Sequence, residues 1–219
     1  MTPQARVCAA ITVLDRVLAG EAAEKALIGW ARGARYAGSG DRAAVRDHVF
    51  DALRGMRSLA ALGGAMTGRG LMIGLMRRDG ADLAATFDGV GHGAAPVRAD
   101  EAGKVPQTPA EAGDLADWLY PLFKDALGPD CDPVLAAMQA RAPMFLRVNL
   151  SRTDRAGAQM ALAAEGIATR FHHSVKTALE VTENIRKVSR SSAYLSGLVE
   201  VQDASSQAAV LALPLNAGQ

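Results

Sequence analysis

The apolar residues of this chain follow one period in its first part and another in its last part, and this change limits the possible folds. Up to about residue 76, apolar side chains recur every three or four residues, which is typical of one face of an amphipathic helix. Glycines separate these stretches, so the spacing predicts several short-looped helices that pack into a small bundle. The expected helices cover residues 7–18, 22–36, 42–62 and 71–76.

In the last third of the chain the apolar residues alternate instead. This alternation, with β-prone residues such as Phe145 and Val148, predicts short strands. A helix is expected over 154–165, closed by Gly166, and another begins near Ser205. Strands that alternate with helices predict a small α/β layer, so the chain as a whole is expected to have an α+β fold. The expected strands cover 144–150, 167–171, 178–182 and 198–202.

Glycine and proline interrupt both patterns between residues 80 and 109, where no apolar period is visible. This composition is typical of a connecting stretch. The predicted division of the chain is a helical domain over 1–79, a Gly/Pro-rich linker over 80–113, a small α/β domain over 114–200, and the start of a further domain over 201–219.

Charge is unevenly distributed along the chain, although the net charge is only +1. Lys and Arg outnumber Asp and Glu by 12 to 7 over residues 1–80, whereas the counts are 3 against 8 over 81–129 and 9 against 8 over 130–219. A basic block followed by an acidic one indicates separate units, one of which can face an anion. Aromatic residues make up only 5% of the chain, so the cores are expected to consist of Ala, Leu, Val, Met and Ile.

The residues alone point to no catalytic or metal site. The chain has no glycine-rich phosphate loop and no GxSxG motif. Cys8 and Cys131 lie in no CxxC pair or ligand cluster. His172 and His173 are adjacent, and adjacent strand residues point to opposite faces, so shared metal binding is not expected. No apolar run reaches the roughly 18 residues of a membrane span, and the N-terminus does not have the pattern of a signal peptide.

Arginines cluster in the third expected helix, and two interpretations of them remain open. One is a solvated helix face on which arginines pair with interspersed aspartates. The other is a surface that contacts phosphates. The arginines are Arg42, Arg46, Arg54 and Arg57, preceded by Arg32 and Arg35, and the aspartates are Asp41, Asp47 and Asp51.

Three stretches carry a resemblance to a known family. The first is the segment A-R-A-P-M-F-L-R-V-N over 140–149, followed by Arg155 and the ending E-G-I over 165–167. The second is D-W-L over 117–119, although no proline precedes its tryptophan. The third is G-L-V-E-V-Q-D-A-S-S-Q over 197–207. In this order and spacing they resemble the segments ahead of, and at the opening of, the catalytic domain in the Sun/Nop family of RNA cytosine-5 methyltransferases.

The first helices are similar to the NusB-like domain of the bacterial ribosomal RNA members of that family, the RsmB-like proteins. The residues that carry this similarity are Arg6, Leu14, Asp41-Arg42-Ala43, Val45, Asp47-His48-Val49-Phe50 and Leu53-Arg54. The resemblance implies a NusB-like helical domain over 1–79, an RNA-recognition-like α/β domain over 114–200, and the start of a Rossmann-type methyltransferase domain over 201–219. The remainder of that domain is expected to be missing from this chain.

The family's chemistry uses a cysteine nucleophile, a second cysteine and S-adenosylmethionine, all placed after this point. Neither Cys8 nor Cys131 matches those cysteines, so no catalytic residue is carried over. S-adenosylmethionine is implied for the parent protein, and none is expected bound to this chain. Gln202, Asp203 and Ser205 would approach the edge of the cofactor site or brace the next helix, which Ser205 can cap.

What the resemblance leaves for this chain is substrate handling. Asn149 is interpreted as a structural tie, because polar groups at a domain junction need partners. The chain is expected to be a monomeric, cytoplasmic, RNA-binding region of a ribosomal RNA cytosine-5 methyltransferase, inactive alone and without membrane or metal partners. The alternative is a stand-alone NusB-like module that binds RNA or a ribosome-assembly partner. The residues expected to contact RNA are Arg42, Arg46, Arg141, Arg147, Arg152, Arg155 and Arg170.

Overall fold

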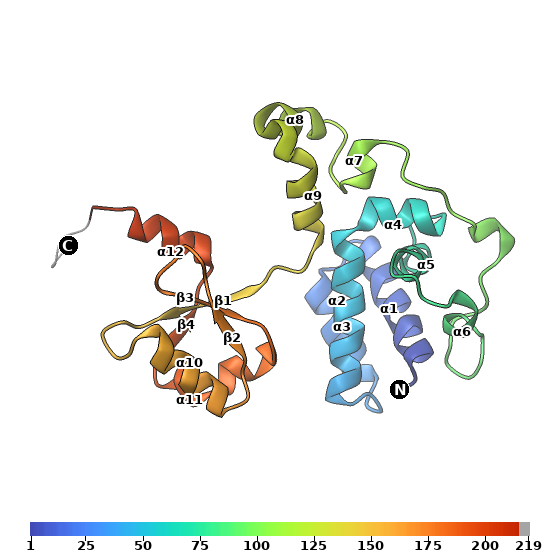
Figure 1. Ribbon diagram of the computed structural model, residues 1–219. Coiled ribbons are helices and arrows are strands. Elements are labelled where there is room, and N and C mark those ends of the chain that lie inside the picture. The colour runs from blue at the N-terminus through green and yellow to red at the C-terminus, as the bar shows by residue number, and fades with distance from the viewer. Residues whose placement is uncertain (215–219) are drawn as a thin grey trace. The chain divides into compact units, whose positions relative to one another are not determined.

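The computed structural model describes residues 1–214, and the chain forms two compact units, Met1–Arg141 and Ala142–Gln219. Each unit has a hydrophobic core of its own. The first unit is helical and the second contains a four-stranded sheet (Figure 1). The end of the expected methyltransferase start, residues 215–219, lies outside the described residues.

The bundle of the first unit consists of α1 (Pro3–Leu18), α2 (Ala23–Gly33), α3 (Ser39–Arg54), α4 (Met56–Gly63) and α5 (Gly68–Arg78). Helix α5 packs against α1, α3 and α4, and Figure 1 gives an end-on view of it. All of its residues from 71 to 76 are buried. The core around it is largely aliphatic and methionine-rich, as the low aromatic content predicts.

The long helix expected over 42–62 breaks at Gly55, where α3 ends and α4 begins. Asp114, distant in sequence, stabilises the new helix start, because its carboxylate accepts hydrogen bonds from the backbone N–H groups of Arg57 (2.7 Å) and Ser58 (2.9 Å). A carboxylate at a helix N-terminus also interacts favourably with the helix dipole. The cap comes from more than 50 residues away, so local periodicity does not reveal this break.

Helix α5 begins before the expected 71–76, in a glycine-rich stretch where no apolar period marks a helix. Thr67 caps it by accepting a hydrogen bond from the N–H of Gly70 at 3.0 Å. The glycines let α4 and α5, which are bent by 89° from one another, bring their backbones together. A Cβ atom at Gly74 would overlap the carbonyl oxygen of Leu59, and one at Gly63 would overlap that of Gly70.

The rest of the first unit contains α6 (Leu83–Thr86), η1 (Ala99–Glu101), α7 (Pro109–Ala112), α8 (Tyr120–Leu127), η2 (Gly128–Asp130) and α9 (Cys131–Gln139). Helices α8 and α9 enclose a small cluster around Leu115, Cys131 and Leu135. The compact units divide between Arg141 and Ala142, while the functional domain limits expected from the sequence stay a prediction.

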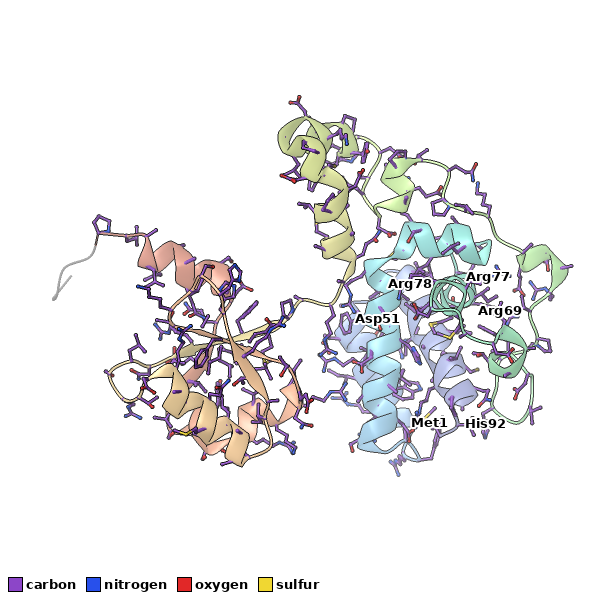
Figure 2. The ribbon with its side chains drawn as sticks, in the orientation of Figure 1. Met1, Asp51, Arg69, Arg77, Arg78 and His92 are labelled. Atoms are coloured by element: carbon purple, nitrogen blue, oxygen red, sulfur yellow. The ribbon has the colours of Figure 1, made fainter. Side chains whose placement is uncertain are left out.

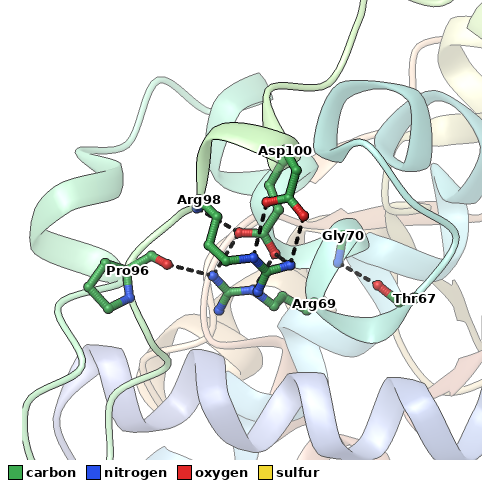
Figure 3. A network of polar contacts seen from close by, with 7 residues as sticks. Thr67, Arg69, Gly70, Pro96, Arg98 and Asp100 are labelled. Carbon is green, nitrogen blue, oxygen red and sulfur yellow. Dashed lines mark hydrogen bonds and ion pairs between the residues drawn. The ribbon is translucent and has the colours of Figure 1, made fainter.

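The Gly/Pro-rich stretch after α5 is anchored to the bundle. Phe87 is 1% exposed in the main core, and the N–H of Lys104 donates to the carbonyl of Ala61 at 2.8 Å. Arg69 of α5 binds Glu101 through two hydrogen bonds of 2.6 and 2.9 Å and also donates to the carbonyl of Pro96 (Figure 3). These contacts hold the segment in place although it has little regular structure.

The second unit contains β1 (Met144–Val148), α10 (Arg155–Ala164), β2 (Thr169–Phe171), β3 (Ala178–Val181), η3 (Ile185–Arg190), α11 (Ser192–Leu195), β4 (Val199–Val201) and α12 (Ala204–Leu211). The sheet order is β2-β3-β1-β4, and every neighbouring pair is antiparallel. Two split β-α-β units arranged in this order make a ferredoxin-like fold.

The two faces of this sheet differ in what covers them. Alternate strand residues, such as Leu146 and Leu179, point to the face covered by α10 and α11, where Leu162 completes the core. The second face carries Phe145, Arg147, Arg170, Glu180 and Glu200, as the strand register places them in adjoining rows. Helix α12 packs on part of this second face through Ala204, beside Phe145, Val175 and Ala178.

The predicted α+β fold is thus confirmed, with a helical bundle followed by a small α/β domain. The likeness of the bundle to NusB stays a prediction. Between Met1 and Pro214, no single helix is both long and apolar enough to cross a membrane, and α4 with α5 meets the criteria only as a bent pair. Within the same residues no group of three or more His, Cys, Asp or Glu side chains is placed to hold a metal ion.

Candidate RNA interface

The α3 arginines that the sequence singles out are engaged with protein groups. Arg46 forms an ion pair with Glu24 of α2 at 2.6 Å and lies 5.7 Å from the centre of the Phe50 ring. Arg42 is exposed and donates to the carbonyl of Ala37 at 3.1 Å. The geometry therefore favours the ion-paired interpretation for Arg46, and leaves the guanidinium of Arg42 with one backbone partner.

Asp41, at the start of α3, collects three donors. Its carboxylate accepts hydrogen bonds from the N-terminal amine of Met1 (3.2 Å), from Arg6 (2.9 Å) and from the N–H of Gly38 (3.1 Å). Burial acts to raise the pKa of Asp41, but these donors outweigh it, so its pKa lies below the usual value. Asp41 therefore stays charged and holds the N-terminus against the first turn of α3.

Arg141, at the end of the first unit, lies beside α3. Its guanidinium is 3.5 Å from the carboxylate of Asp47, and both side chains are largely exposed. An exposed ion pair of this length contributes little to stability. Arg141 therefore remains accessible to another anion.

On the second face of the sheet, two of the expected arginines pair across strands. Arg170 of β2 binds Glu180 of β3 through two hydrogen bonds of 2.8 Å, which raise the pKa of Arg170. Arg147 of β1 pairs with Glu200 of β4. Each pair is electrically neutral, so a phosphate approaching either arginine would also meet a carboxylate.

The other two arginines lie where several loops meet. The register brings together the end of β1, the start of α10, the end of β2 and the starts of β3 and β4. We call this region the loop end of the sheet. Arg152 donates to the carbonyl of Ser196 and Arg155 donates to that of His172 at 3.4 Å. Within residues 1–214 neither arginine forms an ion pair with a carboxylate.

Aromatic rings accompany these cations at the loop end. The guanidinium of Arg155 lies 4.5 Å from the centre of the Phe171 ring, which is 45% exposed. The rings of His172 and His173 stack at 4.5 Å, and His172 meets Phe145 edge-on at 5.4 Å. Cations interleaved with exposed rings are typical of surfaces that bind single-stranded nucleic acid.

The sequence-based argument about the two histidines was wrong. It applied strand geometry, in which neighbouring side chains point to opposite faces, although the strand expected over 167–171 ends at Phe171, as β2 does, so both histidines lie beyond it. The backbone turns there, and Nδ1 of His172 accepts the N–H of Val175 at 3.0 Å. That turn allows the two rings to stack.

Asn149 serves as a tie within the second unit. Its side-chain amide donates to the carbonyl of Gly197 at 3.2 Å, and its oxygen accepts the hydroxyl of Ser151 at 2.7 Å. These bonds join the end of β1 to the loop before β4 and to the turn before α10. The contacts observed for its side chain thus lie inside this domain.

The Q-D-A-S-S segment forms the turn between β4 and α12. Asp203 is the N-cap of α12, and it accepts the N–H (2.8 Å) and the hydroxyl (2.6 Å) of Ser205. These hydrogen bonds lower the pKa of Asp203. Ser205 was expected as a possible cap, but the capping group is Asp203, because Ser205 already lies within the helix.

Two glutamines complete this turn. The buried Gln207 donates to the carbonyl of Gln202 at 3.0 Å and accepts the hydroxyl of Thr177 at 2.7 Å. The side-chain oxygen of Gln202 is buried without a hydrogen-bond partner among the described residues. The geometry fits the bracing role expected for this segment, since it fixes α12 to β1 and to the start of β3.

Comparison with known proteins supports the resemblance stated from the sequence. Residues 115–188 match the family described as Methyltr_RsmF/B-like, ferredoxin-like domain. The chain is 34% identical over 102 residues to the ribosomal RNA small subunit methyltransferase B of Vibrio cholerae serotype O1, and the match covers 47% of this chain and 23% of that protein.

The fold also has a counterpart among solved structures. The crystal structure of PH0851 superposes with a TM-score of 0.57 over 96% of this chain and 55% of that one, at 15% sequence identity. At that identity the likeness shows the fold alone. The chain thus spans well under two thirds of both proteins.

Residues 115–188, with the antiparallel order of the sheet, thus define a ferredoxin-like domain of the RsmF/B-like methyltransferase type. The two matches support the resemblance of this chain to the N-terminal portion of the RsmB-like members of the Sun/Nop family.

Proposed function

We propose that this chain is the RNA-binding N-terminal region of a ribosomal RNA cytosine-5 methyltransferase that uses S-adenosylmethionine. In this proposal the chain holds RNA, as a cytoplasmic monomer, for a catalytic domain that the described residues do not include. The observation that carries it is the ferredoxin-like domain shared with RsmF/B-like proteins, together with a relative named as a ribosomal RNA small subunit methyltransferase.

The surface chemistry supports an anionic partner. The loop end of the sheet presents Arg152 and Arg155 without carboxylate partners among the described residues, beside exposed rings. Guanidinium groups that are not neutralised bind phosphates, and exposed rings stack with unpaired bases. The sequence of residues 1–80 adds a net charge of +5, from 12 Lys and Arg against 7 Asp and Glu.

The first test is binding of fragments of small-subunit ribosomal RNA to residues 1–219 at increasing salt. Phosphate contacts release counterions, so log K is expected to fall linearly with log salt, with a slope of about −0.7 per phosphate for a single strand. Contact with three or four phosphates gives a slope of roughly −2 to −3. Affinity that does not change with salt, or absent binding at low salt, contradicts the proposal.

A second test addresses the enzyme rather than the fragment. The full-length product of the native gene is expected to transfer a methyl group from S-adenosylmethionine to carbon 5 of a cytosine in ribosomal RNA. Residues 1–219 alone are expected to show no transfer and no stoichiometric binding of S-adenosylmethionine. A tight complex of the cofactor with these residues contradicts the assignment of the cofactor site to another domain.

A protein-interaction module is the second candidate, and exposed apolar side chains near α8 favour it. Trp118 is 73% exposed and Leu122 is 59% exposed in the small α7–α9 region. Large exposed aromatic and aliphatic residues are common at protein interfaces. Stable complex formation with a ribosome-assembly protein, combined with RNA affinity that is absent or insensitive to salt, would select this function.

A further inference from the structure

A groove in the first unit has the composition of a base-binding site. It lies between α1, α2 and the loop at 90–93, and its volume is about 850 Å³. Met1 and His92 both line it, and their labels adjoin in Figure 2. The remaining lining residues are Thr2, Ala5, Cys8, Ala9, Thr12, Trp30, Tyr36, Val90, Gly91 and Gly93.

Small residues of α1 and aromatic rings from other segments line the groove. On α1 the small residues Ala5, Cys8 and Thr12 follow helical spacing along one side. Trp30, Tyr36 and His92 contribute rings from the other segments. None of the lining side chains carries a carboxylate or an Arg or Lys charge. Such a neutral, ring-lined space suits a planar aromatic ligand.

The Tyr36 side chain makes no contact within the described residues that would give it a role in stabilising the fold. Its side chain is 73% exposed, whereas Trp30 packs partly against the main core. Among residues 1–214 no hydrogen bond or ring contact involves the Tyr36 side chain. An exposed aromatic residue at the edge of a groove is available to stack on a ligand.

Two unneutralised cations lie in the same segment as the two rings. Arg32 and Arg35 fall between Trp30 and Tyr36, and both are exposed. Within the described part of the chain, neither guanidinium forms an ion pair or a hydrogen bond. This contrasts with Arg46 of α3, which Glu24 neutralises. The segment that contributes Trp30 and Tyr36 to the groove thus also carries two exposed cations, which are not themselves among the lining residues.

We propose that this groove binds an unpaired base of single-stranded RNA, with Tyr36 stacking on the base and Arg32 and Arg35 contacting flanking phosphates. A nucleotide joins a planar aromatic ring to a negatively charged phosphate, which matches this combination of rings and cations. The proposal rests on the proposed function only in taking RNA as the partner. It adds a contact in the helical unit, separate from the loop end of the sheet.

The test uses residues 1–219 carrying Trp118→Phe, so that Trp30 is the only tryptophan and reports on the groove. Binding of a short single-stranded RNA is followed by anisotropy of a labelled strand and by Trp30 fluorescence. Tyr36→Ala is expected to weaken binding about 10-fold, since stacking on one base contributes roughly 1–3 kcal/mol. Tyr36→Phe keeps the ring and is expected to stay within about 2-fold of the parent.

The charge contribution is tested on the same helix. The double variant Arg32→Ser/Arg35→Ser is expected to reduce the salt slope by about 1.4, which corresponds to two phosphates on a single strand. Lys25→Ser removes a cation near the other end of α2 and is the matched control, with an expected loss of less than about 2-fold. Duplex RNA of equal length is expected to leave Trp30 fluorescence unchanged, because its bases are already stacked.

The outcomes separate this proposal from the proposed function. If single-stranded RNA binds with normal salt dependence but Tyr36→Ala keeps full affinity and Trp30 fluorescence does not respond, the groove is not the site while RNA binding stands. If the parent protein binds no RNA at low salt, both proposals fail. Circular dichroism of each variant verifies folding, which Tyr36→Ala is expected to preserve because the side chain is exposed.

Discussion

The two units reach close packing in different ways. In the helical unit, α4 and α5 cross with their backbones in contact, which only the glycines at 63, 70 and 74 permit. In the ferredoxin-like unit, large side chains such as Leu146, Leu162 and Leu179 fill the space between the sheet and its helices. The first unit is therefore sensitive to added atoms at its helix crossing, and the second is sensitive to removed atoms in its core.

The largest effect is expected from removing a core side chain of the second unit. Leu162 of α10 is completely buried between the sheet and α11. Leu162→Ala is expected to lower the free energy of unfolding by about 3 kcal/mol, because it removes apolar contacts and leaves a cavity. Hydrogen exchange measured by mass spectrometry is expected to rise in peptides from residues 142–214.

Met160→Ala on the same helix is the control for that variant. Met160 is 69% exposed, so its truncation is expected to change stability by less than about 0.5 kcal/mol. If Leu162→Ala raised exchange equally in peptides of the helical unit, the separation into two independent cores would be contradicted.

The next effect tests the helix crossing in the first unit. Gly74→Ala is expected to cost about 2 kcal/mol, because the new Cβ atom overlaps the backbone of Leu59 and the helices must move apart. Gly33→Ala in α2 meets no atom within 4 Å, and it is expected to be neutral or slightly stabilising. Chemical denaturation of both variants gives the difference, and equal stabilities would show that close backbone contact does not matter.

The sequence predicts the second unit better than the first, because the two units depend on different kinds of contact. The four strands and helices α10 and α12 of the second unit agree with the expected ranges to within a few residues, because alternation and capping residues are local signals. In the first unit the break at Gly55 and the length of α5 were missed. The break is fixed by Asp114, which acts across the fold, whereas the start of α5, capped by Thr67, is rich in glycine and carries no apolar period.

The candidate site was predictable only in part. The residue type alone identified the arginines as candidates. Which of them form an ion pair with a carboxylate depends on strand register and helix packing, and these are not visible in the sequence. Arg170 and Arg155 illustrate this, since one meets Glu180 across the sheet and the other meets the ring of Phe171. The stacking of His172 on His173 depends on the turn that follows β2, which the strand pattern does not describe.

A third effect concerns the segment that returns to the bundle after α5. Glu101 is largely buried and hydrogen-bonded by Arg69, which lowers the pKa of Glu101 to about 2. Glu101→Gln is expected to destabilise the protein by about 2 kcal/mol at neutral pH, because it removes charged hydrogen bonds. Asp100→Asn, at a side chain that is 72% exposed, is the matched control and is expected to have little effect.

The depressed pKa also gives this contact a pH dependence. A carboxylate with a lowered folded-state pKa stabilises the fold fully above its unfolded value of 4.5, and this contribution is lost as the pH falls from there through about 2. Glu101→Gln lacks the contribution at every pH. The stability difference between parent and variant is therefore expected to shrink as the pH falls over this range, and a constant difference would contradict the assignment.

The smallest expected effect is on RNA affinity, and it distinguishes the arginines at the loop end from those that are ion-paired on the second face of the sheet. Arg152→Ser/Arg155→Ser removes two cations that have no carboxylate partner among the described residues. RNA affinity is expected to fall by roughly 5- to 10-fold, and the salt slope to fall by about 1.4. Arg170→Gln/Glu180→Gln removes a neutral pair instead, so the net charge stays constant and affinity is expected to change by less than about 2-fold. Equal losses in both variants would mean that the second face of the sheet binds RNA as strongly as the loop end. Arg170 would then leave Glu180 and bind phosphate when RNA is present.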